Sequence, residues 1–194
     1  MKISRMFIYD AYKGTRDYLN TQKKYEIART ILYFAISISL FAAGWISTGK
    51  RENLLTIVAV LGCLPACKSM VDMIMFLKFH GCTGPNADEI VKHSAGLTCL
   101  FDLVFTSYDK NFSVAHLAVC GNTLCGFTQD AKFDEQGFYK HIDTILKKDN
   151  YKNTTVKIFR DIDKYTERLE QLKQLDADEK NTGGIVNTLK SVVL

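Results

Sequence analysis

TILYFAISISLFAAGWISTG, residues 30–49, carries no charged side chain and is mostly apolar. As an α-helix these twenty residues would span roughly 30 Å, the thickness of the hydrocarbon core of a bilayer. A second apolar run, residues 53–77, follows after Lys50, Arg51 and Glu52. So short a turn forces two helices to lie antiparallel. The sequence therefore predicts a transmembrane helical hairpin over residues 30–80 of an integral membrane protein.

The segment before the hairpin is basic. Residues 1–29 carry seven Lys and Arg against three Asp and Glu, whereas residues 82–194 carry fourteen against sixteen. Positive charge stays on the cytoplasmic side of a membrane. We therefore expect a multi-pass protein of the cell membrane, with a cytoplasmic N-terminal segment (1–29) and a cytoplasmic domain after the hairpin. The basic excess would attract anionic lipid, and its place beside a span disfavours nucleic acid as a partner.

The second span carries three residues that an apolar helix normally lacks. Pro65 removes a backbone donor and should kink the helix. Lys68 and Asp72 are four residues apart, so they share a helical face and can pair. In one interpretation Lys68 reaches the headgroups and residues 68–80 run along the interface. In the other, the pair lies in the bilayer and marks an ion or proton path, which needs several copies of the chain.

Residues 84–176 predict a small cytoplasmic α/β domain with a mixed sheet. The expected order is α-β-β-β-α-β-α, in which three antiparallel strands are followed by a helical crossover to a fourth strand. The expected helices cover about 87–94, 134–148 and 162–172, and the expected strands cover 97–108, 112–120, 123–128 and 154–159. Residues 177–194 are expected to form a loose tail, in which Ile185, Leu189 and Val192 could dock as a short helix.

The cysteines favour a reducing compartment. Two of the six lie in the second apolar run and the others lie in apolar or strand-like stretches, so free thiols are expected. Their positions are Cys63, Cys67, Cys82, Cys99, Cys120 and Cys125. His116 lies on the second expected strand, where an exposed or hydrogen-bonded strand histidine is the interpretation preferred over a metal ligand or a partner of a nucleophile.

The order of elements over about residues 86–160 resembles the core of the restriction-endonuclease-like superfamily. The resemblance implies an acidic residue near the second strand and an acid-x-Lys pattern on the third, which hold Mg²⁺ and activate water. Asp102 and Asp109 are candidates for the first acid. The strands read AVC at 118–120 and TLC at 123–125, without acid or lysine, and the adjacent Asp109 and Lys110 have the wrong spacing. A degenerate core is therefore expected.

The whole layout resembles small uncharacterised two-span membrane proteins of Gram-positive bacteria. We expect a membrane-anchored scaffold or binding role, with the lipid bilayer and an unidentified protein as partners. The alternatives are a degenerate nuclease-like enzyme at the membrane and a subunit of a homo-oligomeric channel or transporter. No catalytic, cofactor-binding or metal site is predicted. The polar residues singled out for testing are Asp102, Asp109, Lys110, His116, Lys68 and Asp72.

Overall fold

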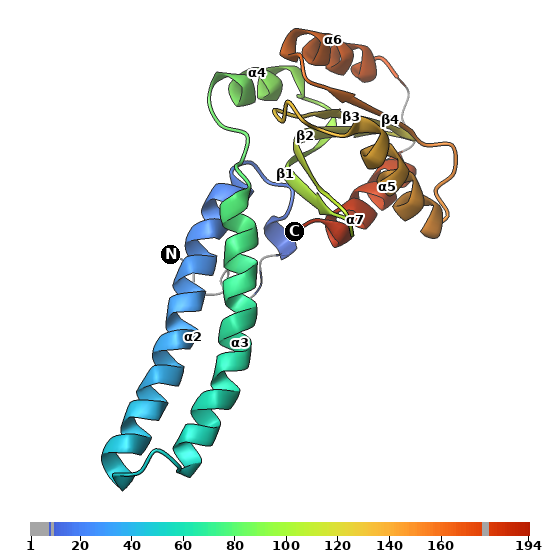
Figure 1. Cartoon of the computed structure of the whole chain (residues 1–194). Helices are drawn as coiled ribbons and strands as arrows, with labels where there is room; N and C mark the ends of the chain where they lie inside the picture. Colours follow the sequence, from blue (N-terminus) through green and yellow to red (C-terminus); the bar gives the residue numbers. More distant parts are fainter. Residues whose placement is uncertain (1–7, 9, 176–178) are drawn as a thin grey trace. The chain divides into compact units, whose positions relative to one another are not determined.

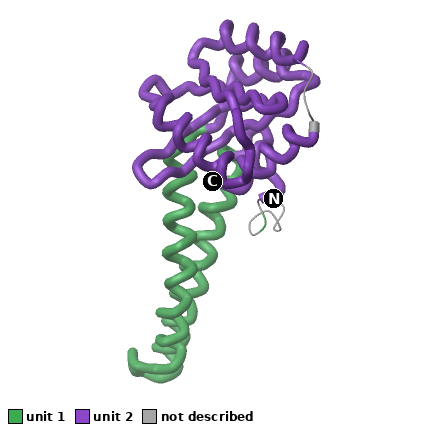
Figure 2. The backbone as a smooth tube through the Cα atoms, turned by 90° about the vertical axis from the view of Figure 1, so that its right-hand side faces the viewer, with its two compact units in different colours: residues 1–9, 19–80 green, residues 10–18, 81–194 purple. Residues whose placement is uncertain are grey.

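The chain divides into two compact units (Figure 2). The computed structural model describes residues 8, 10–175 and 179–194. Residues 19–80 belong to a helical unit, and residues 10–18 and 81–194 together form an α/β unit. The α/β unit is therefore discontinuous in sequence. The prediction placed residues 1–29 in one N-terminal segment, whereas residues 10–18 are part of the α/β fold.

The helical unit is a hairpin of two long helices (Figure 1). α2 spans Tyr18–Thr48 and α3 spans Leu54–Lys78, with Pro65 inside it. α2 ends at Gly49, which has φ +64°, and Asn53 caps α3 by accepting a hydrogen bond of 2.9 Å from the N–H of Thr56. Both helices are long and apolar enough to cross a membrane, and α2 begins twelve residues before the uncharged run.

Small residues fix the pairing of the two helices. Thr30 and Ser69 share a hydrogen bond of 2.9 Å between their hydroxyls. Nearer the turn, a Cβ atom at Gly62 would lie only 2.9 Å from the hydroxyl of Ser37. Any larger residue at position 62 would require the Ser37 hydroxyl to move. With Thr30 opposite Ser69, the uncharged run of α2 faces the part of α3 that ends just before Asp72.

The sheet of the α/β unit has the order β1-β2-β3-β4. β1 (Thr98–Thr106), β2 (Asn111–Cys120) and β3 (Thr123–Phe127) pair antiparallel, and β4 (Thr155–Phe159) lies parallel to β3. The turn between β2 and β3 uses Gly121 with φ +56°. The predicted mixed sheet, in which three antiparallel strands are followed by a helix and a fourth strand, is confirmed.

Helices cover both faces of the sheet (Figure 1). α5 (Glu135–Lys148) and α7 (Glu179–Val192) pack on one face, while α4 (Pro85–His93) and α6 (Ile162–Lys173) pack on the other. The first core includes Leu103, Phe105, Val114, Leu117, Phe138, Ile142 and Leu189. The second includes Ala87, Ile90, Ala118, Cys125, Tyr165 and Leu169.

The C-terminal segment is not a loose tail over its described residues. α7 buries Ile185 and Leu189 in the first core, although it contains Gly183 and Gly184. After the helix, the N–H of Leu194 donates to the carbonyl of Val104 on β1 at 3.0 Å. The glycines suggested a loop from the sequence, but burial of an apolar stripe offsets their low helix propensity.

Candidate functional site

A polar network joins α2 and α3 where the uncharged run of α2 begins. Arg29 is its centre: its Nη2 lies 2.5 Å from Oε2 of Glu26 and 3.1 Å from Oδ2 of Asp72, and its Nε donates to the hydroxyl of Ser69 at 3.2 Å. Gln22 donates to the other oxygen of Glu26 at 3.0 Å. Glu26 is only 1% exposed, so Arg29 compensates a buried carboxylate. The hairpin polar network comprises Gln22, Glu26, Arg29, Thr30, Ser69 and Asp72.

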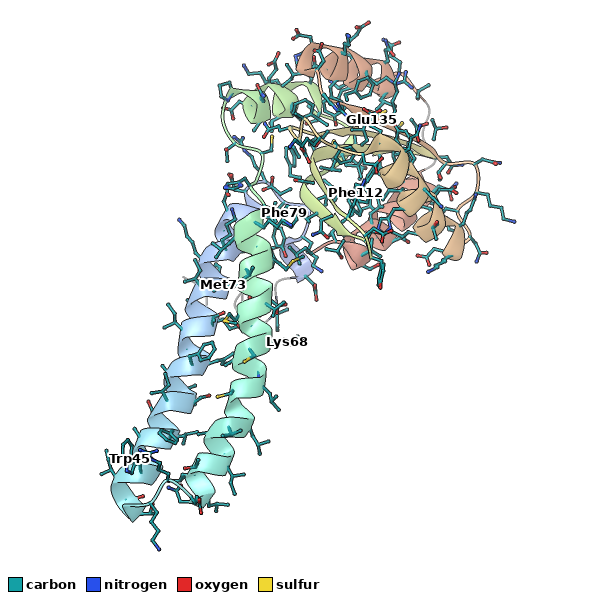
Figure 3. All side chains as sticks on the ribbon, in the orientation of Figure 1. Trp45, Lys68, Met73, Phe79, Phe112 and Glu135 are labelled. Carbon is teal, nitrogen blue, oxygen red and sulfur yellow. The ribbon has the colours of Figure 1, made fainter. Side chains whose placement is uncertain are left out.

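The predicted pairing of Lys68 with Asp72 is replaced by another. Asp72 pairs with Arg29 from the neighbouring helix, and Lys68 is exposed on α3 (Figure 3). Arg29 lies at the level where α3 carries Ser69 and Asp72, and its fork of donors reaches both of them. Sequence pattern alone cannot rank a partner on another helix against one four residues away on the same helix. Lys68 precedes Ser69, which lies opposite Thr30, so it is level with the first residue of the uncharged run.

Asp102 interrupts β1. It has φ +54°, and the side-chain alternation reverses there: Leu100 precedes it and Leu103 follows it, yet both belong to the first core. Its carboxylate is buried, and Oδ1 accepts a hydrogen bond of 2.7 Å from the backbone N–H of Cys82. Burial, and then the charge of Asp102, raise the pKa of the Cys82 thiol to about 11. Asp102 therefore holds the chain segment that follows the hairpin.

His116 belongs to the core between the sheet and α6. Its Nδ1 lies 2.5 Å from the hydroxyl of Tyr165, which donates to the carbonyl of Cys125 at 3.2 Å. Because that carbonyl only accepts, both bonds are made when Nδ1 of His116 carries the proton. Burial lowers the pKa of His116 to about 3, so the ring is neutral near pH 7. The pair is a buried core contact that satisfies Nδ1, whereas Nε2 of His116 has no hydrogen-bond partner among the described residues.

Asp109 and Lys110 border the same surface groove. They lie in the β1–β2 turn, beside a groove of about 380 Å³ between that turn and α5. Lys110 donates to Oδ2 of Asp134 at 2.7 Å, and Asp134 caps α5 by accepting from the N–H of Gly137 at 3.0 Å. We call this feature the α5 groove; its lining also includes Ser107, Phe112, Lys140, His141 and Thr144 (Phe112 is labelled in Figure 3).

The six polar residues singled out in the sequence do not gather at one place. Asp109 and Lys110 border the α5 groove, Asp102 and His116 are buried in the α/β unit, and Lys68 and Asp72 belong to the hairpin. Sequence reasoning missed Arg29, Tyr165 and Asp134 as their partners. Arg29 had a visible signal, as the last charge before the apolar run. Tyr165 was visible only as one position of an apolar stripe.

The residues present do not fit the magnesium site that the nuclease resemblance implies. β2 and β3 carry no acidic residue, and Asp102 is committed to a backbone N–H. Over residues 10–175 and 179–194 no three His, Cys, Asp or Glu side chains are grouped so that they could hold a metal ion. All six cysteines are free thiols.

Comparison with known proteins yields no relative. No family model matches the chain, and no match was found among curated proteins or among solved structures. The argument for a function therefore depends on the geometry of this chain.

Proposed function

We propose that this chain is an integral membrane protein whose α2–α3 hairpin anchors the α/β unit at the inner face of a membrane, where that unit has a binding or scaffold role. The observation that supports it best is the exposure of large apolar side chains along both helices. Ile46 is 85% exposed, Leu54 76% and Leu64 69%. In water such a surface would be a strong aggregation hazard, whereas in a bilayer it is solvated by lipid tails.

The arrangement of charge supports an inner location for both ends of the hairpin. Lys23, Lys24 and Arg29 precede the uncharged run of α2, and Lys68 lies level with the start of that run on α3. Lys50 and Arg51 lie at the opposite end, but the first twenty-nine residues carry the larger excess. The hairpin polar network then lies at or below the headgroups, where buried charge costs less than at the bilayer centre.

The α5 groove is the best candidate binding surface of the α/β unit. Lys140 and Asp109 border it, Phe112 gives it an apolar wall, and Tyr108 at the adjacent turn is fully exposed. Exposed aromatic side chains are enriched at protein interfaces, which have a polar rim. This supports an unidentified protein partner in preference to catalysis.

Carbonate extraction of membranes tests the anchoring. The full chain should stay in the pellet at high pH, because its exposed apolar faces are in contact with lipid. As a matched pair, Ile38→Lys places a charge on the exposed face of α2 inside the uncharged run, and Lys24→Ile removes one outside it. Membrane retention should fall for the first and stay unchanged for the second. Release of the wild-type chain by carbonate would overturn the proposal.

Two alternatives keep their own tests. The nuclease-like alternative has only the order of its elements in its favour, because the residues present do not fit its magnesium site; absence of cleavage with any divalent ion would eliminate it. The channel reading depends on Lys68 and Asp72, and ion flux unchanged in a Lys68→Ala, Asp72→Ala double variant would eliminate it. The pairing of Asp72 with Arg29 gives that residue a structural role.

A further inference from the structure

Two chain segments connect the α/β unit to the hairpin. We call residues 10–17, which lead into α2, the strap, and residues 81–84, which follow α3 and precede α4, the linker. Both are part of the α/β unit. They are attached to β1 at adjacent residues, Phe101 and Asp102.

The strap is attached through Gly14. Its carbonyl accepts a hydrogen bond of 2.9 Å from the N–H of Phe101. Gly14 has φ +79°, and a Cβ atom there would lie 2.6 Å from the side chain of Leu100, so only glycine fits. Arg16 secures the strap to α4 by an ion pair of 2.6 Å with Asp88.

The linker is attached through Asp102. Oδ1 accepts the N–H of Cys82 at 2.7 Å, and a Cβ atom at Gly81 would lie 2.7 Å from Oδ2. Glycine at position 81 thus lets the backbone reach the carboxylate. The side chain of Cys82 is 1% exposed and packs in the second core. The linker is therefore part of the packed fold.

Asp102 has an unfavourable backbone conformation and a buried carboxylate, and its hydrogen bond to the linker accounts for both. A left-handed conformation is unfavourable for a residue other than glycine, and a buried carboxylate must recover its lost hydration through hydrogen bonds. Both are found at one residue in the middle of a strand. The conformation turns the carboxylate toward the linker while Phe101 keeps its pairing with His116 on β2.

We propose that Phe101 and Asp102 form a clamp that holds the strap and the linker as one unit, so that displacement of either connection to the hairpin is transmitted to β1. Asp102 is the positioning residue of this clamp. The clamp goes beyond the anchoring role and does not depend on it, because every contact lies within the α/β unit.

The first arm of the test uses the Cys82 thiol as a reporter of the linker. N-ethylmaleimide modification of each cysteine is followed by mass spectrometry on the full chain in detergent. Asp102→Gly keeps the left-handed backbone and removes the carboxylate, whereas Asp102→Asn removes the charge and keeps an acceptor. The pair therefore separates loss of the hydrogen bond from the effect of charge on thiol reactivity.

Cys82 should react about ten-fold faster or more in Asp102→Gly than in Asp102→Asn. Cys125, which is fully buried in the sheet, should keep its wild-type rate and so reports global unfolding. Equal Cys82 rates in the two variants, with Cys125 protected, would overturn the role of Asp102.

The second arm needs no variant, so it still tests the clamp if Asp102→Gly unfolds the chain. Hydrogen exchange of the wild-type chain gives opening free energies for two amides: that of Cys82 in the linker, which donates to Asp102, and that of Phe101 on β1, which donates to Gly14 in the strap. A clamp predicts that they open together, with protection factors that agree within about three-fold. Opening of Cys82 well before Phe101 would show two independent attachments and would overturn the clamp.

Discussion

Arg29 of α2 and Asp72 of α3 form an ion pair with 3.1 Å between Nη2 and Oδ2. Arg29 also compensates the buried carboxylate of Glu26, so its removal would leave that charge without its cation. Such a loss typically costs about 3–5 kcal/mol. Arg29→Met should therefore lower the thermal midpoint of the detergent-purified chain strongly. Lys68→Met, one turn away on α3 and exposed, should leave it within error. Equal midpoints for the two variants would contradict the assigned network.

Tyr165 and His116 give a second prediction, on coupling within the core. Tyr165→Phe removes the hydroxyl that bridges His116 and the Cys125 carbonyl. Leaving buried polar atoms without partners costs about 1–3 kcal/mol in the free energy of unfolding. In a His116→Phe background the same change should cost clearly less, because one of the two orphaned groups is already gone. Additive losses, measured by urea unfolding, would show that the two side chains are not coupled.

The stability of the α/β unit should depend on pH through His116. Burial lowers its pKa from 6.5 to about 3. Between these values the unfolded chain holds a proton that the folded chain lacks, so the free energy of unfolding falls as the pH falls from 6.5 toward 3. Full stability is present above about pH 6.5, and the slope is at most about 1.4 kcal/mol per pH unit.

The control for this pH dependence is His116→Phe. The variant should be less stable than the wild type at pH 7.5, because Tyr165 loses its partner, yet it should lose less on acidification to pH 4.5. The thermal midpoint of each protein is followed across that range. If the thermal midpoints of the two proteins fell in parallel on acidification, the lowered pKa of His116 would not be the source of the pH dependence.

The C-terminal helix gives a prediction that separates a packed helix from a loose tail. Leu189 is fully buried in the first core, while Asn187 on the same helix is exposed. Leu189→Ala should lower the free energy of unfolding by about 2–5 kcal/mol, and Asn187→Ala should change it by less than about 0.5 kcal/mol. If neither substitution changed the free energy of unfolding measured in urea, α7 would not be part of the core.

The sequence predicted the parts of this fold that depend on local pattern. Period-two and period-3.6 stripes located the strands and helices of the α/β unit, and an uncharged run located the hairpin. For residues 177–194 it favoured a loose tail because of Gly183 and Gly184, and it offered a short docking helix with Ile185 and Leu189 only as an option; burial of these two side chains stabilises α7.

Partners distant in sequence could not be predicted. Asp102 accepts a hydrogen bond from Cys82, and Asp72 pairs with Arg29, only because the fold brings these residues together. Helix spacing identifies only partners three or four residues away, so it predicted that Lys68 pairs with Asp72. It gave no indication that Asp102 would adopt φ +54° inside a strand.

Protease accessibility of the α/β unit in intact and lysed cells tests the central claim most directly. The chain carries a C-terminal tag, and the membranes are washed with carbonate before analysis. The account predicts that the tag is protected in intact cells, is digested after lysis, and is recovered in the carbonate-resistant pellet. Digestion in intact cells would place the α/β unit outside, and recovery in the carbonate supernatant would mean that α2 and α3 do not cross the bilayer.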